Sequence, residues 1–177
     1  MSEILLSYNL FDIMIKKVEV FLLKVEFLGH AAFLITEGEF TLLFDPFLTG
    51  NPLASKKADE IKPKHILVSH AHSDHLGDTV AIAKNSGAKV YTTFELGQMF
   101  EKEGIDVQPG NLGGWLPADF GAVKLFQAFH GSGIAGGHAC GFVVELRDKK
   151  IYFAGDTALF GDMSLLQSEE IDLALLP

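Results

Sequence analysis

The sequence predicts an α/β fold in which two sheets carry outer helices. Three observations predict it. β-Branched and aromatic residues alternate with polar ones over residues 18–45, strand and helix patterns alternate over residues 65–103, and further strand patterns follow from residue 123 onward. Two packed sheets with helices outside them bury one face of every such element. Because 177 residues suffice for one sizeable core, we expect a single domain over residues 1–177.

The first half of the chain changes from a β-meander to strand–helix alternation. Gly29 and the Glu37-Gly38 pair divide residues 18–45 into consecutive antiparallel strands, and the turn formers of residues 46–63 predict a long surface loop. The elements expected next are a buried strand at 65–69, a helix at 78–85, a strand at 88–93 and a helix at 94–103 that ends at Gly104.

The second half contains mainly strands. Glycine and proline are frequent in residues 109–121 (PGNLGGWLPADFG), which predicts an irregular connection there. The elements expected after it are strands at 123–129, 140–146 and 150–155, a short helix near 162–167 and a last strand at 171–177.

Composition excludes several kinds of partner. The net charge of −9 disfavours nucleic acid, because binding a phosphate backbone normally needs a clustered basic surface. One cysteine, Cys140, cannot form an intramolecular disulfide, so we expect a cytoplasmic location. No apolar stretch reaches the roughly 18 residues of a membrane span, and Glu3 and Asp12 argue against a signal peptide, so no membrane partner is expected.

The segment SHAHSDHLGD concentrates potential metal ligands directly after the predicted strand at 65–69. It places His70, His72, Asp74 and His75 within six positions. Imidazole and carboxylate ligands suit zinc, with manganese or iron as alternatives. The structural alternative is a histidine-rich surface turn, but active sites of α/β folds lie at this carboxyl edge of the sheet. The motif therefore predicts a metal site.

This His-X-His-X-Asp-His pattern resembles the metallo-β-lactamase-like hydrolase superfamily. FLGHAAFLI, LLFDPFLTGNP, QAFHGSG and AGDTALFGDM are further similar to uncharacterised metal-dependent hydrolases related to ascorbate-6-phosphate lactonase. The resemblance extends over residues 27–177 and implies a four-layer αββα sandwich that catalyses metal-dependent hydrolysis.

The resemblance also implies a site of two divalent metal ions, expected to be zinc. Its residues would be His70, His72 and His130 at the first ion, Asp74 and His75 at the second, and Asp156 as the bridge between them. His130 and Asp156 each end a predicted strand, so both can reach the sheet edge that carries the motif. Either Asp74 or Asp156 would manage the proton during hydrolysis.

Two further residues are candidates for the surroundings of this site. His30 follows Gly29 at a strand end, and a role beside the metal ligands, a substrate contact and plain packing all stay open. Asp45 precedes Pro46 and either orients a ligand histidine or starts a turn.

The sequence departs from the resembled family at both ends. The family has a further histidine ligand in a later segment, whereas no histidine of this chain lies beyond His138. Residues 1–20 form an atypical N-terminal extension. We expect that the sequence is part of a longer protein or derives from a truncated gene, which leaves the second half of the sandwich incomplete; completion by another chain or an added ligand is the third alternative.

The predicted function is hydrolysis of a small ester-like, lactone or phosphorylated substrate by a metal-activated water or hydroxide. The alternative is a catalytically inactive, truncated metal-binding or interaction protein. A flavodiiron-like oxidoreductase is disfavoured because His70-Ala-His72 stands where that branch often has a glutamate. The oligomeric state stays open, with a homo-oligomer among the alternatives.

Overall fold

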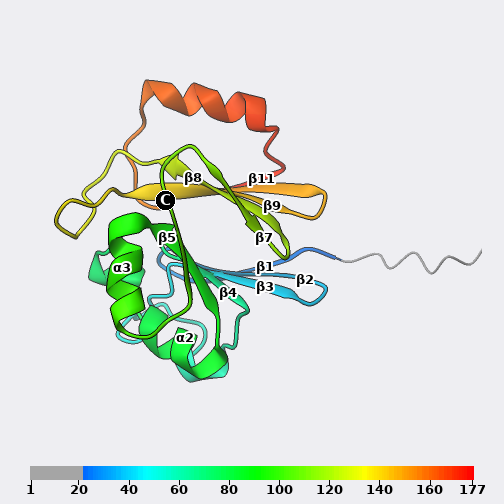
Figure 1. Ribbon diagram of the computed structural model, residues 1–177. Helices are drawn as coiled ribbons and strands as arrows, with labels where there is room; N and C mark the ends of the chain where they lie inside the picture. The colour runs from blue at the N-terminus through cyan, green and yellow to red at the C-terminus, as the bar shows by residue number, and fades with distance from the viewer. Residues whose placement is uncertain (1–21) are drawn as a thin grey trace, which may run out of the picture.

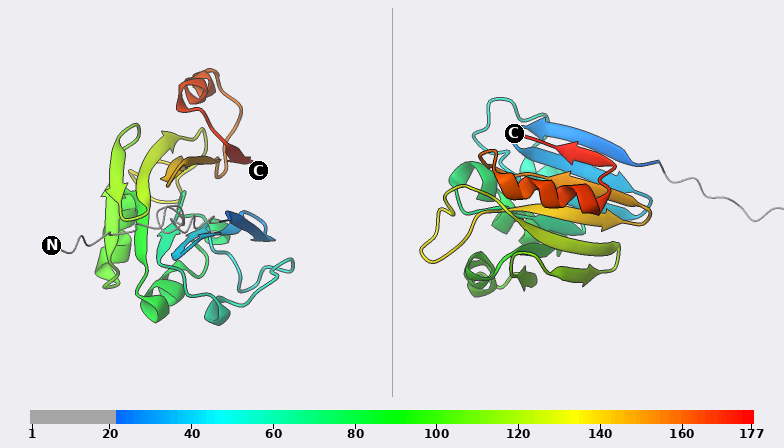
Figure 2. Two further views of the ribbon diagram at one scale, coloured as in Figure 1. Left: turned by 90° about the vertical axis from the view of Figure 1, so that its right-hand side faces the viewer. Right: turned by 90° about the horizontal axis from the view of Figure 1, so that it is seen from above.

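The computed structural model describes residues 22–177; the expected N-terminal extension over residues 1–20 lies outside them. Two sheets pack face to face, with helices α2 (Thr79–Ser86) and α3 (Phe94–Lys102) against the outer face of one sheet. A 3-10 helix, η2 (Gly161–Glu169), lies against the outer face of the other sheet (Figure 1; Figure 2). The predicted arrangement of two sheets flanked by helices is confirmed.

The first sheet, which we call sheet A, has the strand order β1-β2-β3-β4-β5-β6. Its strands are β1 (Lys24–Gly29), β2 (Ala32–Glu37), β3 (Phe40–Phe44), β4 (His65–Leu67), β5 (Lys89–Thr93) and β6 (Val107–Gly110). β1 to β3 form the predicted antiparallel meander, and β3 to β6 pair in parallel. Two shorter helices lie in the connections, η1 (Ala58–Glu60) before β4 and α1 (Ser73–Leu76) after it.

The second sheet, sheet B, has the order β11-β10-β9-β8-β7. Its strands are β7 (Trp115–Ala118), β8 (Gly121–Gln127), β9 (Cys140–Leu146), β10 (Lys149–Phe153) and β11 (Leu173–Leu175). All its pairs are antiparallel except β10 with β11. Among residues 22–177, no helix is long and apolar enough to cross a membrane.

Two strands were missing from the sequence prediction. Residues 109–121 were expected to be irregular, yet they contain the end of β6 and the whole of β7. Both strands lie at the edge of their sheet, where one side of the backbone needs no partner. Edge positions tolerate Pro109 and Pro117, because a missing N–H there removes no ladder hydrogen bond. The prediction of an irregular segment was therefore wrong.

The core of the described residues has three clusters, one between the sheets, one beneath α2 and α3, and a smaller one beneath η2. Between the sheets, Phe44 and Leu67 of sheet A contact Phe142 and Phe153 of sheet B in one buried cluster. The residues adjacent to Phe44 and Leu67 in the strands of sheet A face the opposite side of the sheet. There they pack against Leu96 and Phe100 of α3 and against α2. Strand β4 is buried on both faces, which is why its sequence is nearly all apolar.

This topology brings the carboxyl ends of five strands together. β1 and β3 are both antiparallel to β2, and β4 is parallel to β3, so these three strands end at one edge of sheet A. β8 and β10 likewise run in one direction. Backbone hydrogen bonds from Cys140 N, at the start of β9, to Ser69 O (3.1 Å) and from Ala71 N to Ser132 O (2.8 Å) join the loop after β4 to sheet B and its β8–β9 loop at this edge.

Candidate metal centre

The histidine motif lies in a loop and in the short helix α1, not on a strand. β4 ends at Leu67, two residues before the strand end predicted at residue 69, so His70 lies in the loop that follows it. His72 is instead the N-cap of α1, and its carbonyl accepts the backbone N–H groups of His75 and Leu76. The loop and this helical turn bring the two histidine rings together. His130 and Asp156 likewise lie in loops beyond β8 and β10.

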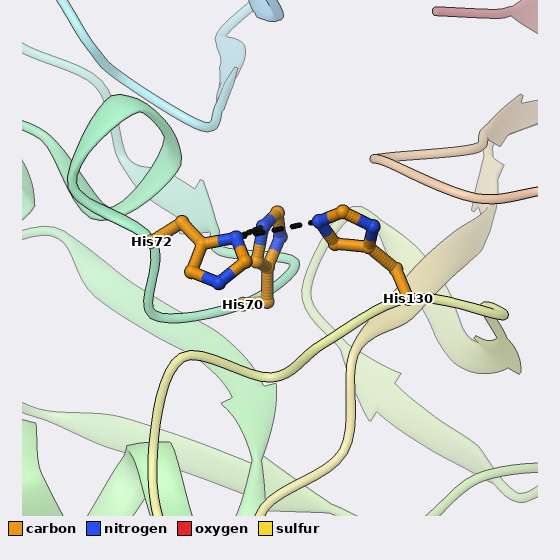
Figure 3. Close-up of side chains that lie close together, drawn as sticks. All are labelled: His70, His72 and His130. Carbon is orange, nitrogen blue, oxygen red and sulfur yellow. Dashed lines mark hydrogen bonds between the residues drawn. The ribbon is translucent and has the colours of Figure 1, made fainter.

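Three imidazole nitrogens converge at the centre of the site (Figure 3). His72 Nδ1 lies 2.9 Å from His70 Nε2 and 3.3 Å from His130 Nε2. His70 and His72 come from the loop after β4, whereas His130 reaches the same point from sheet B. The structure therefore brings together the three residues expected at the first ion.

The spacing of these nitrogens fits a metal ion. Ligand nitrogens about 2.0–2.1 Å from a tetrahedral zinc ion lie about 3.3 Å from one another, close to the 2.9 and 3.3 Å observed here. A cation also gives three lone-pair acceptors a shared partner, which neighbouring imidazoles cannot all provide for one another. The donor set therefore suits zinc or a similar divalent ion.

Asp45 and Ser69 fix the orientation of His70. Asp45 accepts hydrogen bonds from Ser69 N (2.7 Å) and Ser69 Oγ (2.5 Å), and Ser69 Oγ lies 2.9 Å from His70 Nδ1. Because the hydroxyl proton points to the carboxylate, the oxygen accepts the Nδ1 proton, which leaves the Nε2 lone pair facing the site. Burial and the neighbouring imidazoles of His75, His72 and His130 lower the pKa of His70 to about 3, so this ring is neutral, the form that binds metal.

Asp45 also contacts His75, and both side chains are fully buried. Asp45 Oδ2 lies 2.8 Å from His75 Nδ1, so His75 Nε2 faces the site. Burial lowers the pKa of His75, but the hydrogen bond to Asp45 and its charge outweigh this effect and raise it. A metal ion at Nε2 would displace the proton that this shift favours. With three hydrogen bonds at its oxygens, Asp45 is placed to orient histidines rather than to hold an ion.

Asp156 lies between the two groups of histidines. Its Oδ2 is 3.3 Å from His75 Nε2 and 3.6 Å from His130 Nε2. Asp74 lies on the far side of His75, where its Oδ2 is 3.3 Å from His30 Nε2. Burial favours the neutral acid at Asp74, but its backbone hydrogen bond and the imidazoles of His75 and His30 outweigh this and lower the pKa of the carboxyl.

All eight residues singled out in the sequence thus lie around one centre, while His65 lies apart from it and His138 lies outside the ligand groups of the described residues. His65 is buried against Tyr91 and Phe120, with its Nε2 3.0 Å from Asp119 Oδ1. His138 is exposed in the loop between β8 and β9. Sequence reasoning missed Ser69, whose only signal is its position directly before His70.

Comparisons with known proteins identify the family of this chain. The sequence profile of the Metallo-beta-lactamase superfamily matches residues 25–172. A UPF0173 metal-dependent hydrolase of Symbiobacterium thermophilum is 55% identical over 159 residues, which cover 88% of this chain and 71% of that protein. A second, from Thermus thermophilus, is 48% identical over 160 residues, with coverages of 88% and 71%. The solved structure of a novel metallo hydrolase from Ignicoccus hospitalis matches with a TM-score of 0.79 and 30% identity, over 88% of this chain and 70% of that one.

The chain belongs to the metallo-β-lactamase superfamily, whose profile spans most of its length. Within that superfamily its relatives are the UPF0173 metal-dependent hydrolases, and it is accordingly a metal-dependent hydrolase. The expected superfamily and enzyme class are confirmed.

The position of Asp45 gives a first testable prediction. Asp45→Asn keeps the size of the side chain but turns an N–H₂ group toward donors that need an acceptor. Loss of a partner that orients a metal ligand typically costs 10- to 100-fold in metal affinity, and we expect a loss of about that size. Competition with a chromophoric chelator measures it. Asp119→Asn is the matched control, since Asp119 also faces a histidine but lies away from the site. Equal affinities in the two variants would contradict the role given to Asp45.

Proposed function

We propose that this chain hydrolyses a small lactone, ester or phosphorylated substrate at two divalent metal ions, zinc in the first instance, with manganese or iron as alternatives. His70, His72 and His130 would hold the first ion, Asp74 and His75 the second, and Asp156 would bridge them. The observation that carries the proposal is the convergence of the three imidazole nitrogens, with the Asp156 carboxylate between them and His75.

When bound, the ions supply a water nucleophile at neutral pH and stabilise the negative charge that develops on the attacked carbonyl or phosphoryl group. The residues of the chain orient the ligands and accept the proton. Asp45 and Ser69 hold the rings of His70 and His75 so that their Nε2 atoms face the reaction. Asp156, between the two groups, and Asp74, at the more exposed side, are the carboxylates that can take a proton from the attacking water.

The substrate class rests on the similarity of four sequence segments to the ascorbate-6-phosphate lactonase branch, which supports a lactone or a phosphorylated sugar acid. The net charge of −9 supports a small substrate over a nucleic acid. Fold alone does not choose among the hydrolytic reactions known for such sites. The panel of substrates must therefore include lactones, phosphorylated sugar lactones, thioesters and phosphodiesters.

Removal of the metal tests the proposal directly. We expect the protein to lose turnover of its best panel substrate after dialysis against a chelator, and to regain it when zinc or manganese is added back. Turnover that survives complete removal of metal would contradict metal-dependent hydrolysis by this chain. Two bound ions without turnover of any panel substrate would instead favour a metal-binding protein that is not a catalyst.

A further inference from the structure

His30 lies in a turn whose backbone is held in an unusual conformation. It follows β1 and has a φ of 57°, and Gly29 before it has a φ of 110°. A Cβ atom on Gly29 would lie 2.7 Å from the carbonyl oxygen of Leu53, so only glycine lets this turn press against the 51–55 loop. Ser55 N donates to Leu28 O in the same contact (3.1 Å). The imidazole of His30 is therefore carried by a turn that the neighbouring loop fixes in place.

This turn directs His30 toward two residues of α1. His30 Nε2 lies 3.3 Å from Asp74 Oδ2, and the His30 ring meets the His75 ring edge to face at a centroid distance of 5.0 Å. One ligand atom from each of the three side chains lies within 4.8 Å of the others. His30 and Asp156 also line one cavity of about 350 Å³. His30 thus groups with Asp74 and His75, and it shares a cavity with Asp156.

A second, independent observation concerns His75. Its side chain is fully buried, and its Nε2 atom makes no hydrogen bond with any of residues 22–177, although Asp156 Oδ2 lies 3.3 Å away. A buried polar atom without a partner is costly and is rare in folded proteins. Because Nδ1 is already committed to Asp45, Nε2 is the nitrogen that faces the space between His75 and Asp156, beside His30 and Asp74. A cation in that space would satisfy it.

We propose that His30 is a ligand of the second metal ion, together with Asp74, His75 and Asp156. This inference rests on the two-metal site proposed above. It gives that ion a nitrogen ligand from the β1–β2 turn, a segment far in sequence from the histidine motif. Two imidazoles and two carboxylates suit a divalent zinc, manganese or iron ion.

Two substitutions at position 30 separate a ligand from a hydrogen-bond donor to Asp74. Asparagine and aspartate both tolerate the left-handed backbone found there. His30→Asn keeps an N–H donor for Asp74 but offers a poor ligand for these metals, whereas His30→Asp offers a carboxylate ligand and no donor. His138→Asn is the matched control, because His138 is exposed and lies outside the ligand groups among the described residues.

The measurement is the number of zinc ions per chain by mass spectrometry after equilibrium dialysis at several zinc concentrations. We expect two ions in the wild type, in His138→Asn and in His30→Asp, but a second ion bound more than about 100-fold more weakly in His30→Asn, beyond the 10- to 100-fold cost of losing an outer partner alone. Circular dichroism checks that each variant is folded, and if His30→Asn does not fold, retention of both ions by His30→Asp still supports the proposal.

Two intact sites in His30→Asn, with loss of the second ion in His30→Asp, would overturn the proposal and make His30 a donor to Asp74, while the two-metal hydrolase would stand. Fewer than two ions in the wild type would overturn both the ligand role of His30 and the two-metal site on which it rests.

Discussion

His72→Ala should empty the first metal position and lower kcat/KM by about 1,000-fold or more. His72 Nδ1 lies 2.9 Å from His70 Nε2 and 3.3 Å from His130 Nε2, so its loss leaves only two imidazole ligands in the first group. Metal-ion stabilisation of charge in a transition state is worth several kcal/mol, and about 1.4 kcal/mol corresponds to a factor of ten in rate. Three such factors give the expected loss.

The alanine should leave the fold intact, because the contacts of His72 with the rest of α1 are made by its backbone carbonyl. The measurements are kcat/KM on the best substrate of the panel and zinc content per chain, both beside His138→Ala as a control. A folded His72→Ala protein that retains both its metal and its turnover would show that the three-histidine group is not the first metal position.

Gly77→Ala should be the most destabilising small substitution near the site. Gly77 ends α1 with φ 45° and ψ −127°, a conformation that is essentially restricted to glycine. A Cβ atom there would also lie 2.6 Å from Phe47 Cα and against the carbonyl oxygen of Pro46, which are backbone atoms that cannot turn aside. We expect the free energy of unfolding to fall by about 3 kcal/mol or more, from the sum of strain and overlap.

Urea unfolding of metal-free protein measures this loss without a contribution from bound ions. Gly87→Ala is the matched control. Gly87 ends α2 in a left-handed conformation with φ 72°, but no heavy atom lies within 4 Å of its added Cβ. Gly87→Ala should lower the free energy of unfolding only through backbone strain, by about 1–2 kcal/mol. Equal losses of unfolding free energy in the two variants would mean that overlap with the 46–47 backbone does not add to the destabilisation by Gly77→Ala.

The spacing of the histidine motif allowed much of the site to be predicted from sequence. Four potential ligands within six positions after an apolar strand required only local information, and the family resemblance added His130 and Asp156, each at the end of a predicted strand. Their convergence on one centre depends on the pairing of β8 to β10 and on the packing of the two sheets. Those are long-range contacts, which a local pattern does not specify.

Other features depended on tertiary context throughout. Serine is common in loops, so nothing in the sequence distinguished Ser69 until its hydroxyl was found between Asp45 and His70. Pro109 and Pro117 argued against strands, and only the edge positions of β6 and β7 make them compatible with one. For His30 the sequence left three roles open, because the direction of its ring depends on the contact of Gly29 with Leu53.

The origin of the first metal group in both sheets has a mechanical consequence. His72 and His130 are 58 positions apart in the chain, and an ion held by both closes a loop of that length. Closing a long loop removes conformational freedom from every state in which the sheets have separated. The same ion that activates water would then cross-link the two sheets, so that loss of metal would lower the stability of the sandwich as well as abolish hydrolysis.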